Sequence, residues 1–305
     1  MAYQLEQVNA AVRRDPAAYM AQCDQIFHHK VAHAADHIQR NLPRSPVVLL
    51  SGPSGSGKTT TAGMVEQELE KRGISTHTIS LDDYYTDPDP VSAPRTPEGA
   101  LDFESPLLLD IPLLDDHFTR LAKGEEVTVP HFDFTRRQRD GRKGRALRLQ
   151  PNEVAIFEGI HALNPQITGK HPEATRMYIS TQSNVMDHTR VCFKRTWLRL
   201  VRRTVRDYNF RGTGVEDTLE MWANVCRGER QYITPYRRTA HIRLDTTLPY
   251  EVSVMAQYAR PMLSALPAHI LKAHELDAVL RAFDQFAPIR PDTIPPASLL
   301  HEFIG

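Results

Sequence analysis

The sequence predicts an α/β protein built on a doubly wound, mostly parallel sheet. Short apolar runs of strand length alternate with stretches of helical spacing along the 305-residue chain, and this alternation is typical of a parallel sheet covered by helices. The first run ends in a cluster of glycines that a predicted helix follows at once. With 41% hydrophobic residues, the chain has enough apolar surface for one large domain with extensions.

The predicted elements follow one another in this order. Residues 1–44 have a helical pattern, and we expect an N-terminal helical extension there. Strands of the main sheet are predicted at 47–51, 76–81, 154–157, 177–179 and 241–244, within a domain spanning 45–265. Residues 266–305 predict a C-terminal helix and a proline-rich tail that wraps the surface.

One segment predicts a small β-hairpin subdomain beside the main sheet. The stretch "VTVPHFDFTRRQRDGRKGRALRLQ", residues 127–150, contains two β-rich runs. A basic turn around Asp140 and Gly141 lies between them, and Asp-Gly is a strong turn signal.

The glycine-rich stretch "LLSGPSGSGKTTTAG" predicts a phosphate-binding loop. A strand, the spacing Gly52-x-x-x-x-Gly57-Lys58-Thr59 and a helix start follow one another, as in the P-loop NTPase fold. Backbone amides and the helix dipole would bind phosphates, with Lys58 at the outer phosphates and Thr59 on Mg²⁺. The alternative is an incidental flexible turn, which the flanking strand and helix disfavour. The predicted ATP contacts are Gly52, Ser54, Gly55, Ser56, Gly57, Lys58, Thr59 and Thr60.

Acidic residues follow two predicted strands at the edge where ligands bind in such sheets. In "SLDDYY", Asp82 is a candidate catalytic base, with Asp83 beside it, and Asp82 and Tyr84 are expected to contact the substrate. In "FEGIHALNP", Glu158 is a candidate Mg²⁺ ligand. The alternatives are a helix-capping aspartate and an ordinary strand-end glutamate.

The stretch "KRTWLRLVRRTVRDYNFRG" predicts an arginine-rich helix that acts as a lid over the phosphate loop. Arg195, Arg199, Arg202 and Arg206 recur at helical spacing, with Arg203 adjacent. Leu198, Val201 and Val205 form an apolar stripe. Only Asp207 could pair with these arginines locally, which favours a phosphate-binding role over a solvated face. Nucleic-acid binding is the competing use.

Composition narrows the possible partners. The formal net charge is zero, so neither nucleic acid nor a membrane is favoured as a partner. The three cysteines, Cys23, Cys192 and Cys226, have neither metal nor disulfide spacing. No signal peptide or membrane-spanning run is apparent. We therefore expect a soluble cytoplasmic protein, and a homo-oligomer remains open.

The ordered set of motifs resembles the uridine kinase–phosphoribulokinase family of P-loop kinases, in its bacterial nucleoside kinase-like branch. The matching pieces are "GPSGSGKTT", "SLDDYY", "LDFESP", "VPHFDFTRRQR", "FEGIHALNP" and "LVRRTVRDYNFRG", and the resemblance spans about residues 47–263. It implies a kinase that uses ATP and Mg²⁺ to phosphorylate a hydroxyl of a small acceptor.

The resemblance also implies roles for individual residues. Asp82 corresponds to the general base, Glu158 to the acidic residue near the metal, and Arg203, Arg206 and Arg211 to lid arginines. Glu104 stands where the family has an aspartate that binds ribose hydroxyls. Phe132 replaces a tyrosine and Arg137 a histidine, both contacts to a pyrimidine base in the family. The acceptor pocket has therefore changed more than the phosphate machinery.

These observations predict transfer of the γ-phosphoryl group of ATP to a uridine- or cytidine-like nucleoside. A phosphorylated sugar or other small hydroxy compound is the alternative acceptor. A nucleotide-driven switch or nucleic-acid-binding ATPase is the alternative of another class.

Overall fold

A five-stranded parallel sheet lies at the centre of the protein. The computed structural model describes residues 2–89 and 91–305. The strands are ordered β12 (Ile242–Asp245), β9 (Thr175–Ser180), β2 (Val47–Ser51), β8 (Glu153–Glu158) and β3 (Ser75–Ser80). All neighbouring pairs are parallel, so the predicted fold class and its strands are confirmed, with ends shifted by one or two residues. Within the described chain no helix is both long and apolar enough to cross a membrane.

The central strand β2 divides the hydrophobic core into two layers. Val48 and Leu50 point into the layer that includes the N-terminal helices, whereas Val47 and Leu49 point into the layer beneath the hairpin region. Every residue of β2 is buried, because helices cover both faces of a parallel sheet. This burial explains why the strand is a continuous apolar run.

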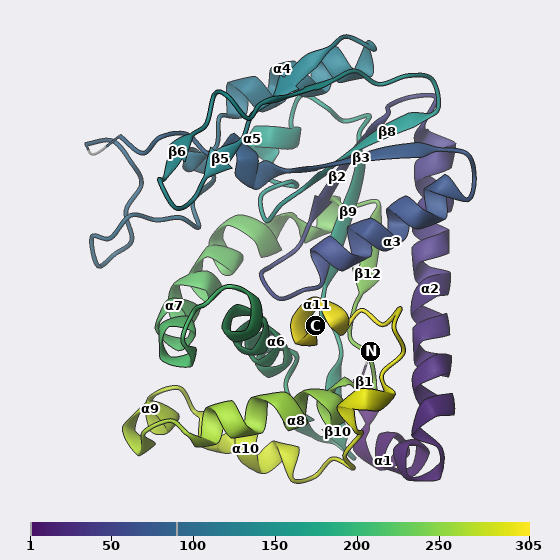
Figure 1. The fold of residues 1–305 in the computed structure, drawn as a ribbon, viewed down its shortest axis with the longest axis vertical. Helices are drawn as coiled ribbons and strands as arrows, with labels where there is room; N and C mark the ends of the chain where they lie inside the picture. The colour runs from purple at the N-terminus through teal and green to yellow at the C-terminus, as the bar shows by residue number, and fades with distance from the viewer. Residues whose placement is uncertain (1, 90) are drawn as a thin grey trace.

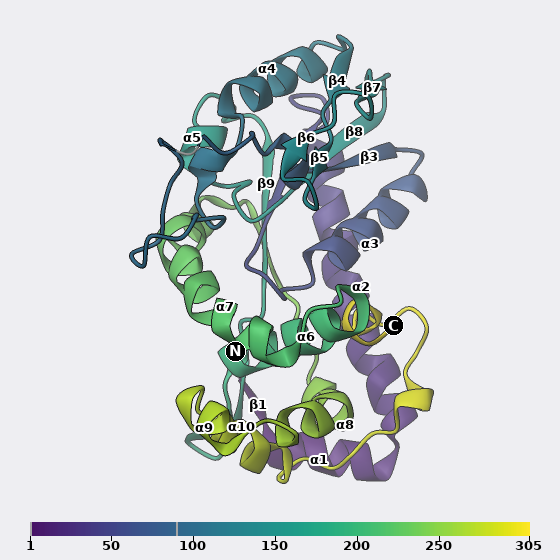
Figure 2. The ribbon, with the colours of Figure 1, turned by 60° about the vertical axis from the view of Figure 1, so that its left-hand side comes forward.

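Helices surround the sheet (Figures 1 and 2). On one side the long α2 (Pro16–Asn41) packs along α3 (Lys58–Glu70). On the opposite layer lie α4 (Ile111–Ala122) and the short α5 (Pro165–Thr168). The helices α6 (Arg195–Phe210) and α7 (Val215–Gly228) stand beside the phosphate loop. The last group is α8 (Glu251–Ser264), α9 (Ala268–Ala273) and α10 (Leu276–Phe283).

The predicted hairpin region is a pair of two-stranded ladders. The outer ladder joins β4 (Val127–Val129) to β7 (Arg145–Leu147), and the inner one joins β5 (Phe132–Asp133) to β6 (Gln138–Arg139). The predicted turn at Asp140 and Gly141 is present, with the Lys143 amide donating to the Asp140 carbonyl oxygen at 3.1 Å, but it leads from β6 to β7, which belong to different ladders. The tight hairpin turn lies at 134–137, between β5 and β6. Arg137 takes a positive φ of 54° in that turn, a conformation that the sequence pattern does not reveal.

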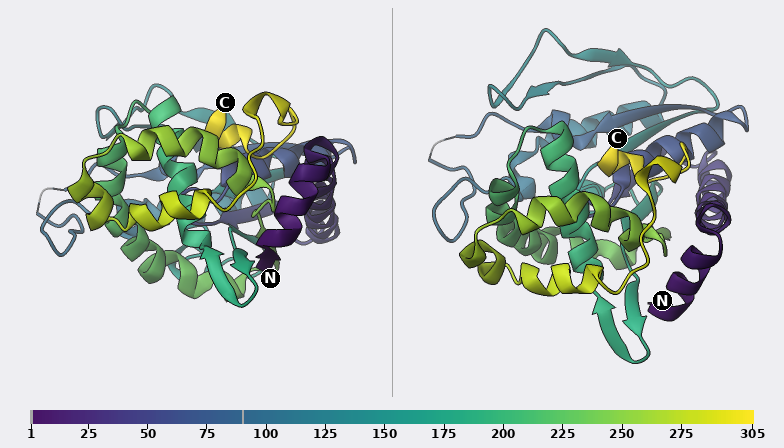
Figure 3. Two further views of the ribbon diagram at one scale, coloured as in Figure 1. Left: turned by 90° about the horizontal axis from the view of Figure 1, so that it is seen from below. Right: turned by 60° about the horizontal axis from the view of Figure 1, so that its bottom comes forward.

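The N-terminal segment is helical, as expected, but it also contributes a strand. After β1 (Ala2–Gln4) come α1 (Leu5–Arg14) and α2. β1 pairs in parallel with β10 (Asn184–Asp187), which pairs with β11 (Arg190–Phe193) in a hairpin that projects from the body (Figure 3). One hydrophobic cluster joins α1 and α2 to the sheet and to the C-terminal helices. The domain boundaries at 44/45 and 265/266 stay predictions.

The segment after α10 is not a tail on the surface, so that expectation is wrong. Its residues Leu299, Leu300 and Phe303 are buried. The short α11 (His301–Ile304) packs against α6 and lies close to the phosphate loop (Figure 1). Apolar side chains spaced along a proline-rich segment bring it into the core.

Candidate active site at the phosphate loop

The loop between β2 and α3 presents unpaired backbone amides. The amides of Gly55, Gly57, Lys58 and Thr59 have no acceptor within residues 2–89 and 91–305. They lie at the N-terminus of α3, where free amides and the helix dipole attract anions. The loop is therefore an anion-binding cradle of the kind that phosphate groups fill.

Two glycines are needed for this loop geometry. Gly57 has a φ of +83°, a conformation that side chains disfavour. At Gly52 a Cβ atom would lie 2.0 Å from the carbonyl oxygen of Ile179 in β9. The loop therefore begins pressed against the neighbouring strand and ends in a left-handed turn.

Lys58 lies among carboxylates at the base of the cleft. Burial lowers the pKa of Lys58, and the nearby Glu158, Glu302 and Asp82 oppose this shift. Burial raises the pKa of Glu158, against the effect of Lys58. The Lys58 ammonium group donates to the Pro53 carbonyl oxygen at 3.4 Å, and its charge acts on the three carboxylates beside the phosphate cradle without a direct ion pair among the described residues.

Asp82 and Asp83 have different surroundings. Asp83 accepts hydrogen bonds from His131 at 3.1 Å and from the backbone amide of Phe132 at 3.4 Å, so it fixes the hairpin region to the 3₁₀ turn Leu81–Tyr84. The side chain of Asp82 is open to the cleft. Crowding by protein atoms raises the pKa of Asp82, while Lys58 and Arg211 oppose the shift. Of the two, Asp82 is the carboxylate placed to accept a proton in the cleft.

The arginines of α6 are largely paired, which corrects the expectation that they lack acidic partners. Arg199 forms an ion pair with Glu229 at 2.6 Å. Arg202 is fully buried and holds Glu251 through two hydrogen bonds. These acidic residues lie 30 and 49 positions away in the sequence, so local spacing gave no sign of them.

The second half of α6 turns its arginines toward the phosphate loop. Arg203 donates to Ser54 Oγ at 2.8 Å and pairs with Asp207 at 3.2 Å. Arg206 donates to Asp207 at 2.6 Å, and Arg211 lies 3.6 Å from the same carboxylate. One buried aspartate therefore orients all three arginines at the cleft. Movement of α6 as a lid stays a prediction.

A cavity of about 670 Å³ opens beside Asp82. Its lining joins Ser54 of the phosphate loop to Asp82, Glu104, Arg203 and Arg211. Tyr85, Phe103 and Phe134 form part of the remaining wall, and Arg137 lies 5.6 Å above the Phe103 ring. A concave site that combines apolar walls with convergent polar and charged groups is typical of small-molecule binding.

Residues 47–252 match the family model of the phosphoribulokinase/uridine kinase family. The chain belongs to this family. A uridine kinase of Staphylococcus haemolyticus is 28% identical over 202 residues, 66% of this chain and 87% of that protein. One of Anoxybacillus flavithermus is 29% identical over 203 residues, 66% and 86% of the two chains. Among solved structures, D-glycerate 3-kinase of Cryptococcus neoformans has a TM-score of 0.34 and 18% identity, over 87% of this chain and 89% of that one.

Membership makes the protein a kinase, an enzyme that transfers a phosphoryl group to a hydroxyl group. The P-loop at Gly52–Thr59 and the carboxylates at the ends of β3 and β8 lie together in the structure, as expected for this family. The phosphate loop, Asp82, Glu158 and the arginines of α6 thus converge on one cleft.

Two expected substrate contacts of this kinase do not face the cavity beside Asp82. Tyr84 is fully buried, and its hydroxyl bonds to His117 at 2.8 Å. Phe132 is also buried, packed between Tyr85 and Phe134. The expectation for both is corrected, because the 3₁₀ turn and the hairpin twist direct Tyr85 and Phe134 to the cavity instead.

Sequence reasoning missed Phe103, Phe134 and Tyr85 as cavity-lining residues. Tyr85 follows the predicted contact Tyr84, and Phe134 lies two positions after the predicted contact Phe132. An alternating pattern would have identified the inward side chains, but a 3₁₀ turn and a two-residue strand are too short to show one.

Glu302, in α11, was also missed. Its Oε2 accepts a hydrogen bond from the backbone amide of Thr60 at 3.0 Å. Leu299 lies against Gly57, where a Cβ would meet its Cδ1 at 3.1 Å. The segment after α10 therefore covers one end of the phosphate loop and occupies an amide that an anionic ligand would otherwise take.

Replacing Glu302 with alanine is expected to tighten nucleotide binding about tenfold. The change frees the Thr60 amide and removes one negative charge beside Lys58, and a charge-assisted hydrogen bond contributes roughly 1.5–3 kcal/mol. Titration calorimetry with a non-hydrolysable ATP analogue measures the effect. Glu302→Gln separates charge from hydrogen bonding. Unchanged affinity in both variants would show that Glu302 only caps α3.

Proposed function

We propose that this kinase transfers the γ-phosphoryl group of ATP, with Mg²⁺, to a hydroxyl of a small sugar-containing acceptor. A uridine- or cytidine-like nucleoside is the first candidate. The observation that supports this most directly is the cavity that connects Asp82 to the phosphate loop and has aromatic walls. A sugar hydroxyl beside Asp82 would then point at the phosphate cradle, with a flat base between the aromatic side chains.

Each residue of the cleft is assigned a separate role in the reaction. Asp82 takes the proton from the acceptor hydroxyl as its oxygen attacks phosphorus. Lys58 stabilises charge on the outer phosphates. Arg203, Arg206 and Arg211 stabilise the charge that moves onto the transferring group and the leaving phosphate. ATP contacts are assigned to Gly52, Ser54, Gly55, Ser56, Gly57, Lys58, Thr59 and Thr60.

Thr59 and Glu158 are the residues that would hold Mg²⁺. Thr59 is exposed in the first turn of α3, and Glu158 ends β8 beside Lys58. Mg²⁺ commonly takes few protein ligands and completes its shell with phosphate oxygens and water, which fits this sparse donor set. The ion supplies charge neutralisation between the outer phosphates.

A phosphorylated sugar is the second candidate acceptor, because three arginines line the cavity. Arg137, Arg203 and Arg211 all face it. Arg203 and Arg211 are assigned to the transferring phosphate, whereas Arg137 stacks on Phe103 at the far wall. Arginine binds carbonyl, carboxylate or phosphate oxygens and accepts no hydrogen bond.

An acceptor screen tests the proposed reaction. ADP release is measured with uridine, cytidine, other nucleosides and phosphorylated sugars, each with and without Mg²⁺. A kinase releases ADP only with its acceptor, whereas a nucleotide-driven switch hydrolyses ATP without one. Acceptor-independent hydrolysis across the whole set would reject the proposed function.

Arg137→His is expected to shift acceptor preference toward uridine by about tenfold in kcat/KM. The change removes a fixed positive charge and restores a group that can accept a hydrogen bond, and a site with a mismatched polar group discriminates strongly. The ratio of kcat/KM for uridine and an anionic sugar measures it. Arg136→His, on an exposed neighbour in the same turn, is the matched control. An unchanged ratio would show that Arg137 has a structural role in the hairpin and does not determine acceptor preference.

Glu104 is expected to make acceptor use depend on pH. Burial raises its pKa to about 7, with Asp102 reinforcing the shift and Arg203 opposing it. If the carboxylate accepts hydrogen bonds from acceptor hydroxyls, kcat/KM for the acceptor should fall about tenfold between pH 8 and pH 6, as the group becomes protonated. In Glu104→Gln, kcat/KM should no longer fall between pH 8 and pH 6. If kcat/KM of Glu104→Gln still fell with a midpoint near pH 7, the pH dependence would come from another titrating group.

A further inference from the structure

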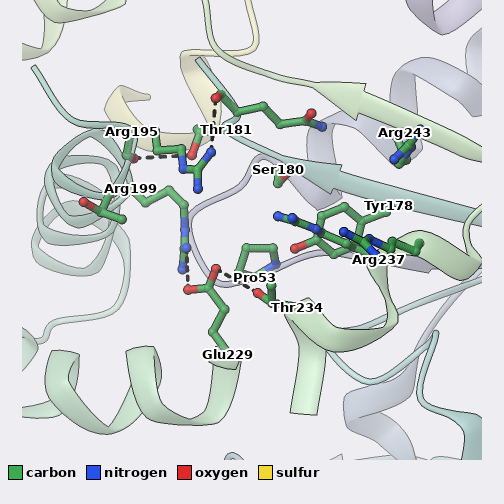
Figure 4. A pocket seen from close by; sticks show the side chains of 13 residues that line it. Pro53, Tyr178, Ser180, Thr181, Arg195, Arg199, Glu229, Thr234, Arg237 and Arg243 are labelled. Carbon is green, nitrogen blue, oxygen red and sulfur yellow. Dashed lines mark hydrogen bonds and ion pairs between the residues drawn. The ribbon is translucent and has the colours of Figure 1, made fainter. Parts of the chain in front are cut away.

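A second cavity, apart from the one beside Asp82, also borders the phosphate loop. It has a volume of about 440 Å³ and shares no lining residue with the acceptor cavity. Pro53 of the phosphate loop forms one wall, and the carboxyl end of β9 forms another through Tyr178, Ser180 and Thr181 (Figure 4). None of its lining residues is among the contacts proposed above for ATP or for the acceptor.

The remaining wall is built from irregular helical turns. A π-helical turn, Glu229–Ile233, follows α7, and the 3₁₀ turn Thr234–Thr239 continues from it. π-helical turns are rare and occur often at functional sites. Here they turn Glu229, Thr234 and Arg237 toward the cavity.

The cavity is strongly positive. Its lining includes a single acidic residue, Glu229, and the arginines Arg195, Arg199, Arg237, Arg238 and Arg243. Glu229 is already paired with Arg199. Arg237, Arg238 and Arg243 form no ion pair with any residue in the described parts of the chain. A recess lined by charge of one sign concentrates counter-ions.

Arg199 gives this cavity a buried, incompletely bonded cation. Its Nε donates to the carbonyl oxygen of Ser54 at 3.0 Å and its Nη1 to Glu229 at 2.6 Å. Its guanidinium also lies 5.5 Å over the Trp222 ring. The side chain is 4% exposed, and Nη2 has no hydrogen-bond partner among residues 2–89 and 91–305. Buried polar groups without partners are rare and call for an explanation.

We propose that this arginine-lined cavity is a binding site for a small molecule that carries two or more phosphate groups, separate from the catalytic cleft. The planar guanidinium group of arginine can donate two parallel hydrogen bonds to two oxygens of one phosphate group. Several arginines around one recess match a chain of phosphates better than a single carboxylate. Hydroxyl groups at the carboxyl end of β9 supply further donors. Because Arg199 also holds the Ser54 carbonyl, the ligand would bind next to the phosphate loop.

A small ligand fits the cavity better than a nucleic acid does. The arginines surround a recess instead of following an extended groove. The lining contains one aromatic residue, Tyr178, which is buried within β9, so no platform for stacked bases is present in the described lining. Nucleic-acid binding usually combines an extended basic track with such a platform.

Calorimetric titration with inorganic triphosphate tests the proposal. The full-length protein is first saturated with a non-hydrolysable ATP analogue and Mg²⁺, so that the P-loop is occupied. Triphosphate should then bind with one equivalent. The variant Arg237→Gln/Arg238→Gln/Arg243→Gln should weaken this binding by about 1000-fold, since each of the three lost charged contacts costs roughly a factor of ten.

A charge-matched variant separates the cavity from general electrostatics. Arg13→Gln/Arg14→Gln/Arg281→Gln removes the same charge from exposed positions elsewhere and should change the affinity by less than about threefold. All six substitutions are at exposed residues, and thermal unfolding checks that both variants fold. Absent triphosphate binding in the wild type, or equal loss in both variants, would overturn the proposal. So would binding of single-stranded RNA, but not triphosphate, that depends on the cavity arginines.

Discussion

Replacing Lys58 with alanine is expected to lower turnover by at least about 10²–10³-fold while the protein stays folded. Lys58 supplies the positive charge that offsets the outer phosphates, and losing one strong donor to a developing charge costs on this order. The effect should be large here because Asp82, Glu158 and Glu302 all lie near Lys58. Without the lysine these carboxylates repel the nucleotide. ADP release under saturating acceptor measures turnover.

Lys71, at the other end of the same helix, provides the control. It follows the end of α3, its side chain is 72% exposed, and it forms a surface pair with Glu68. Lys71→Ala should leave turnover within about twofold, since exposed ion pairs contribute little. Circular dichroism and thermal unfolding establish that both variants fold. Near-normal turnover by folded Lys58→Ala would remove Lys58 from the catalytic machinery.

Asp82→Asn is expected to bind nucleotide normally and to lose about 10²–10⁴-fold in turnover. The amide keeps the size of the carboxylate but cannot take the proton of the acceptor hydroxyl, and general bases contribute on this order. Asp82 is open to the cleft and lines the acceptor cavity. Calorimetry with an ATP analogue and acceptor-dependent ADP release measure the two quantities separately.

Asp83→Asn distinguishes the two neighbouring aspartates. Asp83 accepts from His131 and from the Phe132 amide, so its loss should loosen the hairpin region and lower thermal stability. An asparagine oxygen can still accept one of these bonds, and we expect turnover to fall less than tenfold. If Asp83→Asn abolished turnover and Asp82→Asn did not, the assignment within the pair would be reversed.

The sequence by itself determined the sheet and the position of the phosphate loop. β2 and the loop after it are encoded locally, by an apolar run, spaced glycines and a lysine at a helix start. These signals depend on backbone conformation within a dozen residues. The strand ends that carry Asp82 and Glu158 were found for the same reason, because parallel strands place their carboxyl ends at one edge.

Only the tertiary structure decided which side chains complete the cleft. The sequence could not reveal that Arg199 and Arg202 pair with Glu229 and Glu251, since ion pairing depends on which distant segments meet. Whether Tyr84 or Tyr85 reaches the cavity depends on the rotation of one short turn. Glu302 meets the Thr60 amide 242 positions away, because buried apolar residues carry its segment to the loop. Such contacts arise from packing of the whole chain, which no local pattern records.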